Sequence, residues 1–218
     1  MRTIIFIDGY NLYYGALQRS PYKWLDLYQL FREHILLPDT ELLEVRYYTA
    51  PVLGSLCDDP ESPKRQRQYL QALRKMPPAK TQVIEGKLTK NSAHLRLSEP
   101  IPQAPELNTV RVITLTEKKT DVNIATDMVS GAFLGNYDQA VLCSNDSDME
   151  GALRSIRTHC THIRLGLVAP VLGATTRHIS RDLKQQVHWV KTLNAEALKA
   201  AQLPEKVPGT SIAKPTGW

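Results

Sequence analysis

The sequence predicts a three-layer α/β/α sandwich built on a mainly parallel sheet. Short β-branched apolar runs alternate along the chain with segments of helical periodicity, which is the order expected for parallel strands joined by crossover helices. The first run, 3–7, is apolar almost throughout, as in a strand that is covered on both faces. With 218 residues, of which 42% are hydrophobic, the chain can bury a substantial core.

The first half of the chain contains three strand patterns, each separated from the next by helical spacing. In the second helical segment Asp26 stands at the position of a cap, and Pro38 follows the end. In the third, Ser62 is the expected N-cap, with Pro63 in the first turn. The strands are predicted at 3–7, 43–52 and 81–89, and the helices at 12–19, 26–37 and 62–76.

The second half repeats the alternation after an interruption. Its strands are predicted at 109–117, 138–144, 162–169 and 187–191, and its helices at 120–135, 148–159 and 176–186. The spacing of the apolar residues in the first of these helices predicts an inner side made of Val122, Ala125, Val129 and Phe133.

Two segments depart from this rhythm. Residues 90–109 contain three prolines and little periodicity, so we expect an extended excursion or a hairpin arm, which in a compact domain is often functional or mobile. Residues 204–218, with three prolines and two glycines, are expected to form a loose tail. The predicted organisation is one domain over 1–192 and a C-terminal extension over 193–218.

Composition excludes several classes of function. The net charge of +5 and the pI near 9.1 are compatible with a polyanionic partner without requiring one. The three cysteines form no CxxC pair, so neither a zinc site nor a disulfide framework is expected. No signal peptide or membrane span is predicted, and the expected location is the cytoplasm. No glycine-rich phosphate loop or dinucleotide fingerprint is present.

Four aspartates stand where predicted strands meet helices. Asp8 ends the first strand, Asp146 and Asp148 follow the strand 138–144, and Asp121 opens the helix 120–135. Ligands of parallel sheets bind outside the carboxyl ends of the strands, so these side chains should converge. Each aspartate alone is better explained as a cap or turn residue, but like charges that cluster need a cation. Carboxylate oxygens suit Mg²⁺ or Mn²⁺.

Two further aspartates are left out of this set. Asp127 lies six residues after Asp121, about 240° around a helix, and should face away. Asp138 precedes its strand and should lie at the opposite edge of the sheet.

Three blocks, FIDGYN, EKKTDVNIATDM and SNDSDME, resemble in this order the NYN domain, and specifically its LabA-like branch within the PIN-like nuclease superfamily. The resemblance covers roughly 1–190. It implies a Rossmann-like α/β/α topology and a divalent-metal ribonuclease site. Asp8, Asp121, Asp146 and Asp148 would be the acidic ligands and Asn11 a supporting residue. Lys119 stands where the family usually has glycine, which puts the turn before Asp121 in question.

Other side chains are candidates for substrate contact. Lys118 and Lys119 are placed to hold a phosphate, and Tyr13, in the run GYNLYYG, could stack on a single-stranded base. Ser144 is expected to hydrogen-bond a ligating aspartate.

The predicted function is therefore a Mg²⁺- or Mn²⁺-dependent ribonuclease that cuts single-stranded RNA endonucleolytically. Two alternatives stay open. One is an RNA-binding or regulatory module with weak or no catalysis, and the other is a small-molecule enzyme on the same scaffold. The oligomeric state also stays open, because 90–109 could contact substrate or a second subunit of a homo-oligomer.

Overall fold

The predicted fold class is confirmed by the structure, a computed structural model that describes residues 1–54, 59–172 and 178–218. One six-stranded sheet has the order β3-β2-β1-β6-β7-β8 and all of its pairs are parallel. Its strands are β1 (Arg2–Asp8), β2 (Glu41–Thr49), β3 (Thr81–Glu85), β6 (Gln139–Cys143), β7 (Arg164–Leu172) and β8 (Trp189–Leu193). β1 and β6 form the centre of the sheet.

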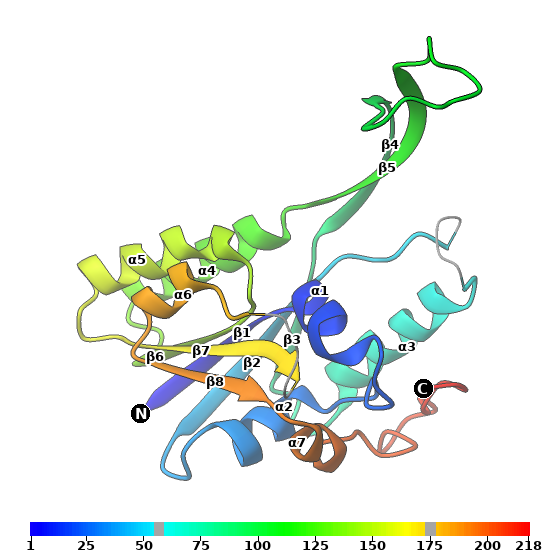
Figure 1. Cartoon of the computed structure of the whole chain (residues 1–218). Helices are drawn as coiled ribbons and strands as arrows, with labels where there is room; N and C mark the ends of the chain where they lie inside the picture. The colour runs from blue at the N-terminus through cyan, green and yellow to red at the C-terminus, as the bar shows by residue number, and fades with distance from the viewer. Residues whose placement is uncertain (55–58, 173–177) are drawn as a thin grey trace.

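Helices cover both faces of this sheet (Figure 1). One face packs against α4 (Thr120–Phe133), α5 (Glu150–His159) and α6 (Arg181–Gln186). The other packs against the N-terminal helical segments, α3 (Ser62–Lys75) and α7 (Ala195–Ala200). Alternation along β1 supplies both cores, because Ile4 and Phe6 face one layer while Ile5 and Ile7 face the other.

The N-terminal helical segments are irregular. α1 (Gly9–Leu12) continues as the π-helical turn η1 (Tyr13–Leu17), and α2 (Leu27–Gln29) continues as η2 (Leu30–Ile35). Asp26 caps α2 as predicted, accepting a hydrogen bond of 3.0 Å from the Gln29 backbone N–H. The prediction that Ser62 is the N-cap of α3 is wrong, because the helix already begins at Ser62. Its N-cap is Glu61, whose side chain makes no capping hydrogen bond.

The prediction that the first and last residues of the inner side of α4 are buried is wrong. Val122 is 67% exposed and Phe133 is 59% exposed, whereas Ile124, Met128 and Ala132 are buried. Apolar residues occur on two sides of this helix, so periodicity alone could not select the buried one. The four-residue spacing of 124, 128 and 132 is the stripe that packs on the sheet.

The expected interruption is a hairpin arm. β4 (Lys87–Arg96) and β5 (Thr109–Lys118) pair antiparallel as a separate two-stranded sheet that projects from the body (Figure 1). Residues 90–96 are thus a strand, and only 97–108 lack strand structure. The predicted strand 81–89 is divided at Gly86, where a Cβ atom would lie 2.6 Å from Thr120 Oγ1.

The C-terminal segment is packed, contrary to the expected loose tail. Val207 is fully buried, and the Trp218 ring contacts Tyr69 and Trp24 at centroid distances of 5.6 and 6.4 Å. Trp24 Nε1 also donates a hydrogen bond to the Pro204 carbonyl oxygen (2.9 Å).

A further prediction differs in its bounds. α6 begins at Arg181 rather than at 176, and 176–177 lie outside the described residues. Among the described helices, none has the length and apolar character needed to cross a membrane.

Candidate metal centre

Asp8 is held in place where the central strand β1 ends. The residue is buried, at 4% exposure. It accepts hydrogen bonds from the Asn11 backbone N–H (2.9 Å), Asn11 Nδ2 (3.0 Å) and Ser144 Oγ (3.0 Å). The first bond caps α1, and the other two fix the second carboxylate oxygen. Asn11 and Ser144, the two residues that the sequence suggested as supports, thus both donate hydrogen bonds to the Asp8 carboxylate.

Asp146 reaches the same edge from the neighbouring strand β6. Ser144 Oγ accepts a hydrogen bond from the Asp146 backbone N–H (3.1 Å) while it donates to Asp8, so one hydroxyl links both aspartates. The Asp146 carboxylate caps the 3₁₀ turn Ser147–Met149 by accepting from the Asp148 backbone N–H (3.1 Å). Its position is therefore set by the end of β6 and by a local turn.

Asp121 arrives from a third segment, the first turn of α4. The residue that precedes Thr120, Lys119, adopts the left-handed conformation with φ +79°. Glycine adopts this conformation at little cost, whereas other residues do so rarely. The turn that is usually made by glycine is therefore present here with lysine.

The three carboxylates converge. One oxygen each from Asp8, Asp121 and Asp146 lie within 4.8 Å of one another. Oxygen donors at this spacing suit a hard divalent cation such as Mg²⁺ or Mn²⁺. Asp148, the fourth predicted ligand, is exposed and does not belong to this group, although its charge contributes to raising the pKa of Asp121.

The excluded aspartates lie elsewhere, as predicted. Asp127 Oδ2 accepts a hydrogen bond from the Tyr48 hydroxyl (2.7 Å). Asp138 pairs with Arg2 at 2.8 Å, at the opposite edge of the sheet.

Sequence reasoning missed two residues of this centre. Glu117, near the end of β5, is half-buried and accepts a hydrogen bond from Thr120 Oγ1. Desolvation raises its pKa, and the charges of Asp8 and Asp121 add to this effect. Asn145 joins three segments, because its side chain binds the Ser180 N–H (2.8 Å) and the His178 carbonyl (3.0 Å) while its backbone N–H donates to Asn11 Oδ1. The signal was the unbroken polar run SNDSD.

Burial and mutual repulsion disfavour the charged forms. Desolvation raises the pKa of Asp8 and of Asp121, and neighbouring carboxylates add to both effects. An acid whose pKa is raised in the folded state contributes stability that is fully present below its unfolded pKa. That contribution is lost as the pH rises through the folded pKa.

We therefore expect the free energy of unfolding of the metal-free protein to fall as the pH rises above about 4, the ordinary pKa of an aspartate, and Mn²⁺ to reverse this fall. Asp121→Asn should flatten the fall, because it removes one of the repelling charges while breaking no hydrogen bond seen among the described residues. Denaturation followed across this pH range in EDTA measures both slopes. A wild-type slope equal to that of the variant would contradict the prediction.

The predicted substrate residues lie around this centre. Lys119 is exposed at the start of α4. Lys118 follows Glu117 in β5 and so projects from the other face of the hairpin. Tyr13 lines a cleft of about 750 Å³, which adjoins the carboxylates.

The comparisons with known proteins agree with this architecture. A family model described as the NYN domain matches residues 2–190. The chain is 36% identical over 237 aligned residues to 6-hydroxy-3-succinoylpyridine 3-monooxygenase HspA of Pseudomonas putida, spanning 100% of this chain and 75% of that protein. A crystal structure of a protein of unknown function from Vibrio parahaemolyticus covers 89% of this chain and 94% of its own with a TM-score of 0.54, at 18% identity, and supports the fold alone. The chain belongs to the NYN domain family.

Proposed function

We propose that the protein is an enzyme that hydrolyses phosphodiester bonds of single-stranded RNA with the help of Mg²⁺ or Mn²⁺. The observation that carries this proposal is the convergence of Asp8, Asp121 and Asp146 from three separate segments within 4.8 Å. Membership of the NYN domain family supports it further, as does the resemblance of three sequence blocks to the LabA-like branch of that family.

The donor set fits a divalent cation, because it consists of carboxylates that repel one another without one. Asp8, Asp121 and Asp146 would hold the ion, with Asp148 and Glu117 adding negative potential around it. A bound divalent cation supplies an activated water and stabilises charge on the phosphodiester oxygens. Asn11 and Ser144 keep the Asp8 carboxylate in one orientation through their hydrogen bonds.

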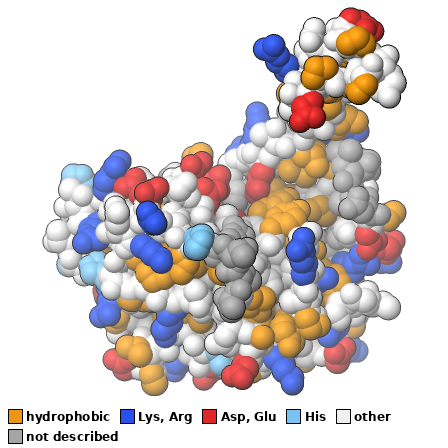
Figure 2. All heavy atoms as spheres, viewed as in Figure 1, with side chains coloured by type: hydrophobic (Ala, Val, Ile, Leu, Met, Phe, Trp, Pro, Cys, Tyr) orange, Lys and Arg blue, Asp and Glu red, His pale blue; other side chains and the backbone are white. Residues whose placement is uncertain are grey.

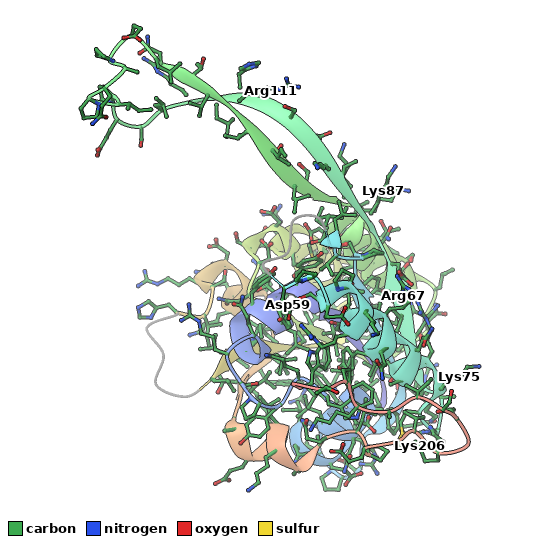
Figure 3. All side chains as sticks on the ribbon, turned by 90° about the vertical axis from the view of Figure 1, so that its right-hand side faces the viewer. Asp59, Arg67, Lys75, Lys87, Arg111 and Lys206 are labelled. Atoms are coloured by element: carbon green, nitrogen blue, oxygen red, sulfur yellow. The ribbon has the colours of Figure 1, made fainter. Side chains whose placement is uncertain are left out.

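Cationic side chains on the hairpin arm favour a polyanionic substrate. Residues directly opposite in an antiparallel pair share a face, and the pair Leu88–Glu117 lies on the face that meets the cleft. The same face carries cationic and titratable side chains farther along the hairpin: Lys90, His94, Arg111 and Arg96. Figure 3 shows Arg111 far out along the arm; Lys87, at its base, belongs to the opposite face of the hairpin. Such a row could contact successive phosphates of a bound strand.

A second function is favoured by the relative from Pseudomonas putida, which aligns with the whole of this chain. That protein is named as a monooxygenase of a hydroxylated succinoylpyridine, and it is 36% identical over the whole of this chain. The aromatic cleft beside the carboxylates is large enough for such a small ring compound. On this second reading the scaffold would act on a heteroaromatic small molecule instead of RNA.

Incubation of the purified protein with end-labelled single-stranded RNA distinguishes these functions. We expect cleavage with Mn²⁺ or Mg²⁺ and none with EDTA, because the carboxylates alone provide no activated water. RNA that is bound but stays intact would favour a regulatory module. RNA that is neither bound nor cut, together with consumption of a hydroxypyridine in the presence of oxygen and an electron donor, would establish the second function.

A further inference from the structure

We propose that the cleft beside the carboxylates binds a planar heteroaromatic ring that carries an anionic group. This proposal rests on the proposed function in one respect. The ring would belong to the substrate of the acidic centre, by which we mean the three carboxylates of Asp8, Asp121 and Asp146. The ring could come from a terminal or unstacked nucleotide of RNA or from a free pyridine-type compound. The recognition chemistry is the same for both.

The walls of the cleft are unusually rich in aromatic rings. Tyr10 and Tyr14 stack at a centroid distance of 5.9 Å, and Tyr13 meets Tyr14 edge-on at 5.2 Å. The lining aromatic side chains are Tyr10, Tyr13, Tyr14, Tyr47, Tyr69 and Trp218. Tyr14 is 56% exposed, so one of these rings is open to a further stacking partner. Flat heteroaromatic ligands gain binding energy on such surfaces by offset or edge-to-face contact.

The cleft and the acidic centre share a wall. Gly9, which lines the cleft, follows Asp8 directly in the chain. Tyr47 also lines it, and the charge of Asp8 is among the causes that raise the pKa of the Tyr47 hydroxyl. Glu117 also lines the cleft, and the charges of Asp8 and Asp121 add to desolvation in raising its pKa. A ring held in the cleft would therefore present its substituents close to the carboxylates.

A cation in the lining indicates the charge of the ligand. Lys23 is half-buried in the cleft and has no ion-pair partner within the described part of the chain. Arg65, the other cation of the lining, is already paired with Asp59. A phosphate or carboxylate group on the ligand would accept a charge-assisted hydrogen bond from this ammonium.

The size of the cleft agrees with one ring and its substituents. Its volume of about 750 Å³ lies within the range of small-molecule sites. Hydrophobic side chains gather on this face directly below the base of the arm (Figure 2). Leu88 of β4 and Leu115 of β5 belong to the lining of the cleft. A strand of RNA on the arm could therefore place one base in the cleft, whereas a free ring compound would use the cleft alone.

Calorimetric titration with four probes in EDTA tests the proposal without requiring metal or catalysis. The anionic probes are uridine 5′-monophosphate and 6-hydroxypyridine-3-carboxylate, and the neutral counterparts are uridine and 2-hydroxypyridine. We expect at least one anionic probe to bind. Tyr14→Ala should weaken that binding about tenfold or more, because alanine removes the open stacking surface. Lys23→Met should weaken the anionic probe alone, and Lys23→Arg should restore it.

Phe133→Ala is the matched control, since Phe133 is equally exposed but lies on α4. Binding of the nucleotide would identify RNA as the source of the ring, and binding of the pyridinecarboxylate a free compound. The proposal is overturned if neither anion binds at millimolar concentration, if Tyr14→Ala and Phe133→Ala act alike, or if neutral and anionic probes bind equally. Ring binding that persists while RNA stays uncut with Mn²⁺ would refute the nuclease but leave the cleft assignment standing.

Discussion

Asp121→Asn should reduce Mn²⁺-dependent RNA cleavage by at least about 100-fold while leaving RNA affinity nearly unchanged. Loss of a residue that only supports a metal ligand typically costs 10- to 100-fold, and a direct ligand should cost more. Affinity should survive because phosphate contacts come mainly from cationic side chains, such as those on the arm. Initial rates at saturating Mn²⁺ and RNA binding measured in EDTA separate the two quantities.

Asp127→Asn provides the control on the same helix. Asp127 faces away from the centre and accepts a hydrogen bond from Tyr48, which asparagine can still accept. We expect its cleavage rate to stay within about threefold of the wild-type rate, well short of the losses seen on removing a metal-supporting residue. Equal losses in both variants would show that the effect comes from α4 as a helix, and the metal role of Asp121 would have to be abandoned.

Gly9→Ala should cost about 3 kcal/mol of unfolding free energy, at the upper end of what an inserted methyl group costs in a packed site. A Cβ atom at Gly9 would lie 2.6 Å from the Tyr48 carbonyl oxygen and 2.7 Å from Tyr47 Cζ. The carbonyl oxygen belongs to the central sheet and cannot move aside, so the chain after Asp8 would have to shift. Urea denaturation of the metal-free protein measures the loss.

Gly151→Ala is the opposite case within the same molecule. Gly151 lies in the first turn of α5, and among the described residues no heavy atom outside the neighbouring backbone of its own helix would come within 4 Å of a Cβ atom there. Alanine should therefore stabilise the protein by about 0.4–1 kcal/mol, because it restricts the unfolded chain and favours the helix. If both alanine variants lost stability to a similar extent, the close approach at Gly9 would not be the cause.

The sheet and the three converging aspartates could be anticipated because both depend on local patterns. Apolar runs define the strands, and parallel strands end at one edge, so residues such as Asp8 and Asp146 must meet there. The order of the strands and the distances between carboxylates follow from packing and required the structure.

The incorrect predictions share a physical cause. Where two residues or segments have the same local sequence character, tertiary contacts determine which of them is buried. Val122 and Ile124 are equally apolar, and only the sheet decides which of them is buried. Trp218 packs on Tyr69 from the far end of the chain, a contact that composition rich in proline and glycine conceals. Glu117 became visible only once the length of β5 and its pairing with β4 were known.

The hairpin arm is joined directly in the chain to the helix that carries one of the three clustered aspartates. β5 ends at Lys118, Asp121 follows three residues later, and the Thr120–Glu117 hydrogen bond braces the junction between them. Lys119, in the left-handed conformation, is the single residue between the end of β5 and the start of the helix that carries Asp121. By thermodynamic linkage, a ligand on the arm and a cation at the carboxylates should each alter the affinity of the protein for the other.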